Sequence, residues 1–329
     1  MKHFIRLCFL FMSILAGLPP NNPVVAQQAP ATDENIPYLV TFGGDANKSW
    51  GDDDFCQIFF VKVPENYKDP VYIKIYDPDT GGELDEKKGT YNTQVRYSVY
   101  GGPECWSNED AQNVNPVGDY KSGILLGSRQ FADESKYDKS WYIFGPFNPQ
   151  EGEYVKKFEG YIFKIIAEGL DGDDGNLYRY FLSSDMNELK EIEGGNMFTY
   201  EYTFRMWNNQ NNVSQIYPYI DDKTTAIQIL NFDWDHDGFI RLVSVAKNGL
   251  LCTISGENAW AKDRFQITEA ERNTSMELQF IKNRSKLIMN NNVVVIVQNQ
   301  HGENLPFYVV PIGGIPVYQP KIRMKVIDK

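Results

Sequence analysis

Apolar and polar residues alternate with a period of two along much of this chain. Residues 199–206, TYEYTFRM, place large apolar side chains at every second position, and residues 71–76, VYIKIY, repeat the pattern. Successive side chains of a β-strand point to opposite faces of a sheet, so this alternation predicts half-buried strands. No long helical pattern occurs; residues 267–276 could hold a single helical turn.

Clusters of Asn, Asp, Gly and Pro separate these runs, as hairpin and sandwich turns require. Further strand-like runs in the first part of the chain cover residues 57–63, 94–100, 123–128, 141–144, 160–167 and 177–183. After residue 212 they cover residues 225–230, 239–246, 250–255, 276–281, 286–289, 293–298 and 307–311. Seven short strands in about 100 residues are typical of a small sandwich. The pattern predicts an all-β chain with two consecutive antiparallel β-sandwiches, of jelly-roll or immunoglobulin-like type.

The division between the two sandwiches is expected at a polar run, NNQNN, which has no side chain worth burying. The roughly 300 residues that remain once a signal peptide is removed also exceed the size of one ordinary core. The predicted organisation is a signal peptide (1–26), a polar spacer (27–37), a first β-sandwich with acidic loops (38–207), a linker (208–212), a second β-sandwich (213–314) and a C-terminal tail (315–329).

The N-terminus has the features of a secretory signal. Lys2, His3 and Arg6 form a basic start, residues 7–18 are mostly apolar, and residues 24–26 offer a small-residue cleavage site. An uncleaved anchor is the alternative, but the apolar run is short for a membrane span and no other segment approaches about 18 apolar residues. We expect an exported protein, periplasmic, cell-surface or secreted, without a transmembrane span.

The charge excludes some partners. The formal net charge is −12, and loss of Lys2 and Arg6 with the signal makes it about −14. Nucleic acid and anionic lipid prefer a basic surface, so neither is expected as a partner.

Three cysteines remain after the signal: Cys56, Cys105 and Cys252. In an oxidising compartment a Cys56–Cys105 disulfide is the favoured pairing, because both residues fall in the first predicted sandwich. The alternative, three free buried thiols, stays open because spacing alone cannot prove a disulfide.

Three acidic loops punctuated by glycine are the strongest chemical signal. They cover residues 77–86 (DPDTGGELDE), 171–176 (DGDDGN) and 233–238 (DWDHDG). Oxygen ligands at alternate positions beside a glycine suit calcium, because several carboxylates converge only where the backbone turns sharply. The candidate ligands are Asp77, Asp79, Glu83, Asp85, Asp171, Asp173, Asn176, Asp233, Asp235 and Asp237.

Crowded carboxylates repel one another, by about 1 to 4 kcal/mol for a close pair near a protein surface, and a divalent cation reverses that sign. Ordinary solvated turns are the alternative, since Asp and Gly favour turns without any metal. Whether the first two loops share one ion is left open. The third loop is not an EF-hand, because its twelfth position is Ser244 and no helices flank it.

The sequence also holds a weak internal repeat. An apolar strand runs into an acidic turn at residues 75–79 (IYDPD) and again at residues 230–235 (LNFDWD). Two related sandwiches would explain this, as would two hairpins that merely have similar turns. We favour the two hairpins.

Motifs for catalysis are lacking. After the signal only His236 and His301 remain, and the chain has no G-x-S-x-G, H-E-x-x-H or phosphate-loop pattern. A carboxylate pair could in principle hydrolyse a glycosidic bond, which makes a glycan-active hydrolase the runner-up to a non-catalytic protein.

Tryptophans beside polar loops are candidates for stacking on sugar rings. Trp106 and Trp260 have the most polar surroundings and are the preferred ligand-binding residues. The alternative for each is packing within or at the rim of a sandwich core.

The first half of the chain has a family resemblance, which rests on residues 57–63, 71–79 and 160–183. An apolar strand entering an Asp-x-Asp turn resembles the pre-peptidase C-terminal type of jelly roll, a calcium-tolerant module of secreted bacterial proteins. The whole chain is similar to exported two-sandwich proteins of Gram-negative bacteria, and residues 321–329 are faintly similar to surface-sorting signals. The resemblance implies a non-catalytic accessory module.

The sequence therefore leads to one functional expectation with two alternatives. We expect an exported binding or structural protein with calcium-stabilised loops that contacts protein or glycan partners outside the cytoplasm. The alternatives are the glycan-active hydrolase and a subunit of a cell-surface or outer-membrane assembly.

Overall fold

The computed structural model describes residues 27–47, 55–114, 116–285 and 287–320. The expected fold class is confirmed: the chain is all-β, and its sheets are antiparallel throughout. In the part of the chain that is described, every helix is a short 3-10 turn, and none has the length and apolar character needed to cross a membrane.

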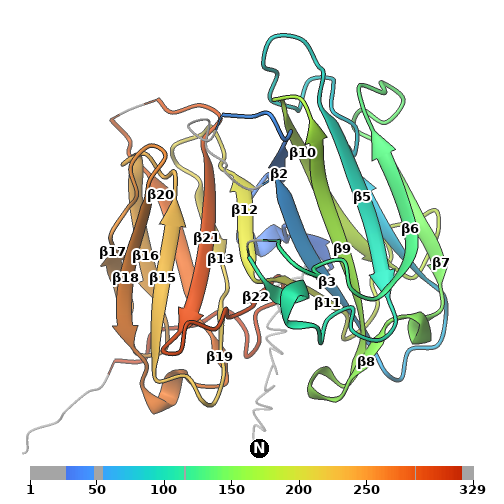
Figure 1. Ribbon diagram of the computed structural model, residues 1–329. Coiled ribbons are helices and arrows are strands. Elements are labelled where there is room, and N and C mark those ends of the chain that lie inside the picture. Colours follow the sequence, from blue (N-terminus) through green and yellow to red (C-terminus); the bar gives the residue numbers. More distant parts are fainter. Residues whose placement is uncertain (1–26, 48–54, 115, 286, 321–329) are drawn as a thin grey trace, which may run out of the picture.

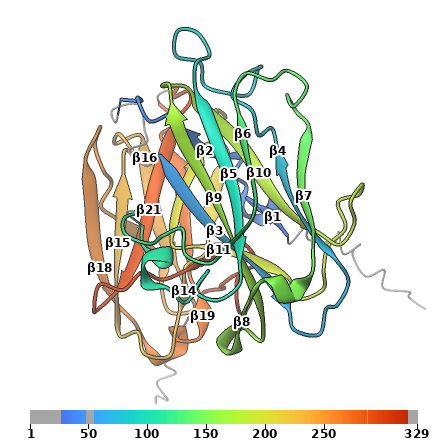
Figure 2. The ribbon, with the colours of Figure 1, turned by 45° about the vertical axis from the view of Figure 1, so that its right-hand side comes forward.

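Eight strands in the first half of the chain form two facing sheets (Figures 1 and 2). They are β2 (Tyr38–Phe42), β3 (Cys56–Pro64), β4 (Val71–Tyr76), β5 (Gln94–Gly101), β6 (Ile124–Phe131), β7 (Trp141–Phe147), β9 (Gly160–Asp171) and β10 (Gly175–Ser183). One sheet has the order β2-β10-β4-β7 and the other β3-β9-β5-β6.

Eight strands in the second half form another pair of sheets, on the left in Figure 1. They are β12 (Glu201–Arg205), β13 (Val213–Ile216), β15 (Ala226–Phe232), β16 (Gly238–Val243), β17 (Asn248–Cys252), β18 (Trp260–Gln266), β20 (Glu277–Lys282) and β21 (Asn292–Asn299). One sheet has the order β12-β21-β15-β18 and the other β13-β20-β16-β17.

The two sets have the same topology. If the strands of each set are numbered one to eight along the chain, both have sheet orders 1-8-3-6 and 2-7-4-5. This is the order of a jelly roll, an eight-stranded double sheet made of two Greek keys. The internal repeat therefore covers whole sandwiches, and our preference for two unrelated hairpins was wrong.

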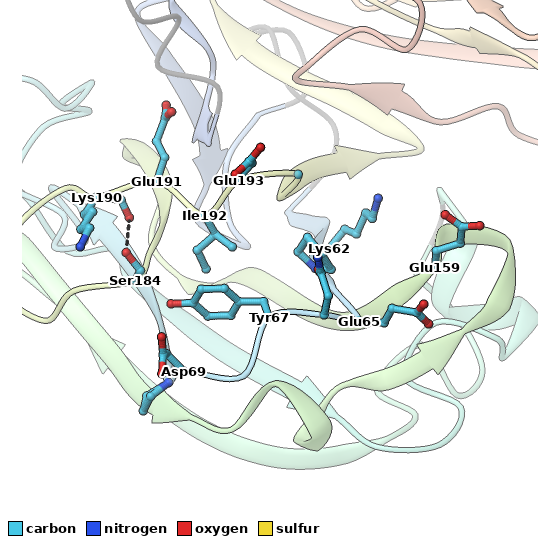
Figure 3. Close-up of a pocket in the computed structure, with 14 residues that line it drawn as sticks. Lys62, Glu65, Tyr67, Asp69, Glu159, Ser184, Lys190, Glu191, Ile192 and Glu193 are labelled. Atoms are coloured by element: carbon cyan, nitrogen blue, oxygen red, sulfur yellow. Dashed lines mark hydrogen bonds between the residues drawn. The ribbon is translucent and has the colours of Figure 1, made fainter.

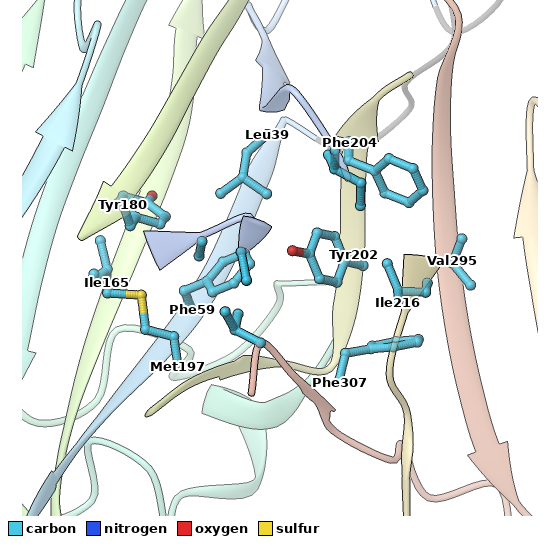
Figure 4. Packing of buried hydrophobic residues seen from close by; sticks show 14 of the residues in the cluster. Leu39, Phe59, Ile165, Tyr180, Met197, Tyr202, Phe204, Ile216, Val295 and Phe307 are labelled. Carbon is cyan, nitrogen blue, oxygen red and sulfur yellow. The ribbon is translucent and has the colours of Figure 1, made fainter. Parts of the chain in front are cut away.

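The two halves share a sheet and a core. Strand β12 pairs with β21 on one side and, through Phe204 and Arg205, with β2 on the other. The side chains of Tyr202 and Phe204 lie between residues of both halves, such as Leu39 and Val295, in one hydrophobic cluster (Figure 4). The run predicted as a linker, residues 208–212, forms the turn between β12 and β13.

Shorter elements extend these sheets or close their ends. The short strands are β1 (Gln28–Ala29), β8 (Glu153–Val155), β11 (Asn196–Thr199), β14 (Tyr219–Ile220), β19 (Thr274–Ser275) and β22 (Phe307–Tyr308). The 3-10 turns are η1 (Thr32–Glu34), η3 (Glu109–Gln112), η4 (Pro149–Glu151), η5 (Lys156–Phe158) and η6 (Glu269–Glu271).

The segment expected to be a polar spacer, residues 27–37, is built into the fold. Strand β1 pairs with β10, and the Glu34 side chain is fully buried, where its Oε2 accepts a hydrogen bond from the Tyr202 hydroxyl at 2.8 Å. Asn35 donates from Nδ2 to the Val213 carbonyl at 2.8 Å. The spacer expectation failed because polar side chains that hydrogen-bond to other elements can be buried at little cost.

The chain ends add little to the described structure. The predicted signal peptide and residues 321–329 lie outside the described residues. In the predicted tail, residues 315–320 are irregular and Gln319 donates its backbone N–H to the Val245 carbonyl. Residues 287–289 belong to no strand, contrary to the strand expected at 286–289.

The favoured Cys56–Cys105 disulfide is not formed, and Cys252 is not in a disulfide either. Cys105 is buried and its thiol donates to the Ile162 carbonyl at 3.2 Å. Burial raises the pKa of Cys105 to about 12, and it does the same for Cys252. Both thiols are therefore poor nucleophiles, because the reactive form is the thiolate.

Candidate metal sites in the acidic turns

The first acidic turn begins where β4 ends. Asp77 adopts a left-handed conformation with φ of 57°. Its backbone N–H donates to the Ser140 carbonyl at 2.9 Å, and its Oδ1 accepts from the Lys139 N–H. The loop before β7 thus holds Asp77 in a conformation that a non-glycine residue seldom adopts.

Buried side-chain oxygens without a donor gather at this turn. Asp77 is 3 % exposed, Asp79 1 % and Asn176 0 %. Among the described residues no donor reaches Oδ2 of Asp77, Oδ1 of Asp79 or Oδ1 of Asn176. A buried acceptor left without a partner costs about 1 to 3 kcal/mol, more for a charged group, so the arrangement calls for a positive or donating group.

The orientation of the Asn176 amide is fixed by its neighbours. Its Nδ2 donates to the Pro78 carbonyl at 3.1 Å, and this oxygen can only accept. A second contact joins Nδ2 to the Tyr97 hydroxyl at 3.2 Å. Oδ1 is therefore the end of the amide that stays available, and amide oxygens are calcium ligands.

The carboxyl groups of this turn are difficult to ionise. Burial above all, together with the nearby charge of Asp138, raises the pKa of Asp77 to about 6 and that of Asp79 to about 7. Burial also holds the pKa of Asp85 well above its usual range. A bound cation would favour the ionised forms, because an opposite charge stabilises a carboxylate.

Asp138 belongs to this group, although the sequence analysis did not select it. Its carboxylate lies directly over Gly82, where a Cβ atom would sit 2.7 Å from the Asp138 Cγ. Its Oδ1 is buried, with no donor in the described part of the chain. Only the pairing of β4 with β7 brings it there; a single acid directly before the Lys139–Ser140 turn carries no distinct sequence signal.

Two predicted ligands of the same loop have other roles. Both oxygens of Asp85 already accept backbone N–H groups: Oδ2 from Gly81 of the same loop and Oδ1 from Leu177 of β10, each at 2.7 Å. Glu83 is exposed and forms an ion pair with Lys139 at 2.5 Å.

The second predicted loop, residues 171–176, meets the first through Asn176. Asp171 is exposed and Asp173 is half-buried. Asp174, which was not among the predicted ligands, is buried and accepts backbone N–H groups from Lys88, Asn92 and Thr93 at 2.8, 2.9 and 3.2 Å. Its carboxylate therefore fastens the neighbouring loop.

The third predicted loop brings its aspartates together. Burial above all, together with the charges of Asp233, Asp237 and Glu257, raises the pKa of Asp235 to about 7. Asp237 is 8 % exposed and its Oδ2 accepts from the Asn291 Nδ2 at 3.5 Å. All three predicted ligands of this turn interact electrostatically, at the end of β15.

Carboxylates alone do not complete a metal site in either turn. Within the described residues, no group of three or more His, Cys, Asp or Glu side chains is arranged to hold a metal ion. Calcium takes six to eight oxygens and accepts amide and backbone carbonyl oxygens and water as well. Any ion here would need Asn176 or Asn291 and such neutral oxygens in its shell.

The candidate sugar-binding tryptophans differ in their surroundings. Trp106 is half-buried, donates from Nε1 to the Tyr200 hydroxyl at 3.2 Å and lines a groove of about 510 Å³ with Tyr219 and Asn304. Trp260 is 44 % exposed and its ring packs on Phe232 at 5.1 Å.

A larger groove of about 930 Å³ lies away from the acidic turns, next to the loops that precede β4 and follow β10 (Figure 3). Tyr67 lies within it, and it is lined by the carboxylates of Glu65, Asp69, Glu159, Glu191 and Glu193. Tyr154 donates to the Glu65 carboxylate at 2.8 Å, at the exposed rim. The groove is polar and open to solvent.

Comparisons with known proteins assign no family. No family model matches the chain, and no curated protein matches it. One solved structure, the cryo-EM structure of T=1 Penaeus vannamei nodavirus, aligns over 80 % of this chain and 96 % of its own at 8 % identity. Its TM-score is 0.16, so the likeness carries no argument.

Proposed function

We propose that this is an exported, non-catalytic binding or structural protein whose loops are stiffened by calcium and which contacts protein or glycan partners outside the cytoplasm. The observation that carries the calcium part is the group of buried oxygens of Asp77, Asp79 and Asn176, for which the described residues supply no donor. Calcium is a fitting counter-charge because it binds carboxylate and amide oxygens together.

The export part rests on the basic, apolar and small-residue segments of residues 1–26. Extracellular modules bind calcium at about 10⁻⁴ to 10⁻³ M, so a site with few carboxylates is filled in a calcium-rich space outside the cell. N-terminal sequencing of the protein recovered outside the cytoplasm tests this part. A mature chain that begins near Gln27 is expected, and an intact Met1 would contradict it.

The glycan part rests on the groove beside Trp106. An indole, the Tyr219 ring and the Asn304 amide line it, and aromatic rings with planar amides suit the faces and hydroxyls of sugars. Titration calorimetry with soluble polysaccharides tests it, with Trp106→Ala as the variant and the exposed Trp260→Ala as the control. Binding that only Trp106→Ala abolishes is expected; equal loss in both variants contradicts the assignment.

Chelation tests the calcium part directly. Thermal unfolding of the purified protein is compared in excess EGTA, in about 10 mM CaCl₂ and in about 10 mM MgCl₂, concentrations chosen well above the expected affinity. The melting temperature should rise with calcium and much less with magnesium, which demands stricter octahedral geometry. Identical melting curves in EGTA and calcium would exclude the metal.

A matched pair of variants locates the ion. Asp79→Asn removes a buried carboxylate of the group, and Asp173→Asn removes a half-buried aspartate outside it. Only Asp79→Asn should reduce the calcium-dependent rise. Equal effects of the two substitutions would show a diffuse response to charge.

A further inference from the structure

The two acidic turns occupy equivalent places in the two halves. Strand β4 and strand β15 are each the third strand of their set, and β7 and β18 are each the sixth. The last residue of β4, Tyr76, pairs with Trp141, and the last residue of β15, Phe232, pairs with Trp260. Asp77 and Asp233 are therefore structurally equivalent, as each follows the last strand residue.

The backbone around these two aspartates repeats in detail. Asp233 has φ of 57°, the same value as Asp77. Its N–H donates to the Ala259 carbonyl at 3.4 Å and its Oδ1 accepts from the Asn258 N–H, as Asp77 does with Ser140 and Lys139.

The residues that precede each sixth strand also correspond. Lys139 and Asn258 are both left-handed, with φ of 53° and 49°. The aromatic pairs beyond them repeat as well, with Trp141 on Tyr76 at 5.2 Å, as Trp260 lies on Phe232. Counting back from each tryptophan, Glu257 occupies the position of Asp138.

An asparagine stands at the same register relative to both eighth strands: Asn176 lies in β10, and Asn291 directly precedes β21. Arg179 of β10 pairs with Tyr76, and Val294 of β21 pairs with Phe232. Three residues before each lie Asn176 and Asn291. Asparagine therefore stands beside both turns.

Asn291 carries an independent sign of a ligand. It is 5 % exposed, its Nδ2 reaches the Asp237 carboxylate at 3.5 Å, and its buried Oδ1 has no donor within the described ranges. Asn176 at the first turn is likewise buried, and its Oδ1 also has no donor among the described residues. Two buried asparagines that keep the same oxygen available at equivalent positions indicate one chemical role.

We propose that the protein holds two calcium ions in two equivalent sites, one per jelly roll. The first site takes Asp77, Asp79, Asp138 and Asn176; the second takes Asp233, Asp235, Glu257 and Asn291. The three acidic side chains of each set do not converge on one point in the described structure, so binding of the ion draws them together. Backbone oxygens and water complete each shell. This inference rests on the proposed calcium function and deepens it, because it assigns three ligands that the sequence motifs do not reveal: Asp138, Glu257 and Asn291.

Equilibrium dialysis of the full-length exported protein against CaCl₂ tests the stoichiometry. Wild type should bind two calcium ions per chain, Asp79→Asn one, Asp235→Asn one and the double variant none. Glu257→Gln changes an exposed side chain, so the variant should fold. It should raise the dissociation constant of the second ion about tenfold, which corresponds to about 1.4 kcal/mol of binding free energy. Asp173→Asn is the control and should keep both ions.

The outcomes separate this inference from the proposed function. One ion in wild type, lost in Asp79→Asn and kept in both Asp235→Asn and Glu257→Gln, overturns the second site and leaves the calcium function standing. No ion in wild type overturns both. Two ions that persist in both second-site variants also overturn the assignment of these ligands, since the second ion would then lie elsewhere.

Discussion

The two acidic turns share a backbone and differ in the cations beside them. Near Asp77 the cationic side chains are Lys139, which is exposed, and Arg179, which is half-buried. Near Asp237 lies Lys282, only 1 % exposed, whose pKa burial lowers to about 8. The second turn thus has a buried cation of its own. The same turn geometry therefore occurs with two different arrangements of counter-charge.

The residue between the first two aspartates of each turn differs too. Pro78 in the first turn presents its carbonyl to Asn176, whereas Trp234 in the second is fully buried and packs on Phe280 at 5.8 Å. The second turn is therefore anchored by core packing. The first depends more on hydrogen bonds and on a counter-charge.

Arg205 connects the two regions. It is 6 % exposed, pairs with Glu86 at the end of the first acidic loop and donates from Nε to Asn292 at 2.6 Å. Asn292 directly follows the Asn291 amide. One buried guanidinium thus contacts a residue of the first acidic loop and the chain neighbour of Asn291.

The largest expected effect is a difference in stability loss between substitutions at the equivalent positions 234 and 78 of the two turns. Trp234→Ala should lower the free energy of unfolding by about 3 to 5 kcal/mol, the usual cost of emptying a buried aromatic site. Pro78→Ala, at the equivalent position, should cost less than about 1.5 kcal/mol because its carbonyl is kept. Urea denaturation measures both, and equal losses would contradict different anchoring.

The next effect concerns Glu34, whose titration makes the stability of the whole protein depend on pH and would mask the pH dependence of the two acidic turns. Glu34 is fully buried and its pKa is raised to about 8, by burial above all, so the fold favours its neutral form. Stability from this group is present below about pH 4.5 and is lost as pH rises toward 8. Glu34→Gln should raise the unfolding free energy at pH 8 by on the order of 2 kcal/mol. A variant as pH-sensitive as wild type between pH 5 and 8 would show that another group titrates there.

Calcium should then act more strongly on the first turn. At 10 to 100 times the dissociation constant, an ion contributes about 1.4 to 2.7 kcal/mol. Because Lys282 already offsets charge in the second turn, Asp79→Asn should remove more of the calcium-dependent rise in melting temperature than Asp235→Asn. Scanning calorimetry with and without EGTA measures the difference, and the reverse order would break the comparison.

The smallest effect is the pH dependence without calcium. The pKa values of Asp79 and Asp235 are both raised to about 7, so each contributes stability that is present below about pH 4 and falls as pH rises to 7. After allowance for solvent screening we expect about 1 to 2 kcal/mol per carboxyl. Asp79→Asn and Asp235→Asn in a Glu34→Gln background should each flatten the stability profile in EGTA by similar amounts.

Saturating calcium should also flatten that profile, since it holds the carboxylates ionised. Unfolding free energies at pH 5, 6 and 7 give the test. A profile in EGTA that neither substitution changes would mean that these carboxyls do not titrate in this range.

Local pattern was sufficient for the fold class and for part of the site. Alternation at residues 71–76 and 199–206 predicted strands because successive side chains of a strand point to opposite faces of a sheet. In β12 both faces are buried, so the polar face of that strand packs inside the protein instead of facing solvent. The strand Trp260–Gln266 escaped notice because it is an edge strand with Lys262, Asp263 and Arg264 in it, and charged edge strands lack the apolar alternation.

In the candidate site, too, residues adjacent in the sequence could be predicted and residues brought in by strand pairing could not. Asp77 and Asp79 are evident as an acidic turn after a strand. Asp138 and Asn176 reach that turn only through the pairing of β4 with β7 and β10. A residue's part in such a group depends on its register across strands, which no nearby residue reveals.

By itself the sequence determined the all-β class, the export-like start, the net negative charge and the places where the chain turns, because these follow from local periodicity, composition and turn chemistry. Only the tertiary structure decided that the two halves repeat one topology, that residues 27–37 are packed into the fold and that an asparagine stands beside each acidic turn. These features come from pairings between strands far apart in the chain, and their free energy appears only when the sheets assemble.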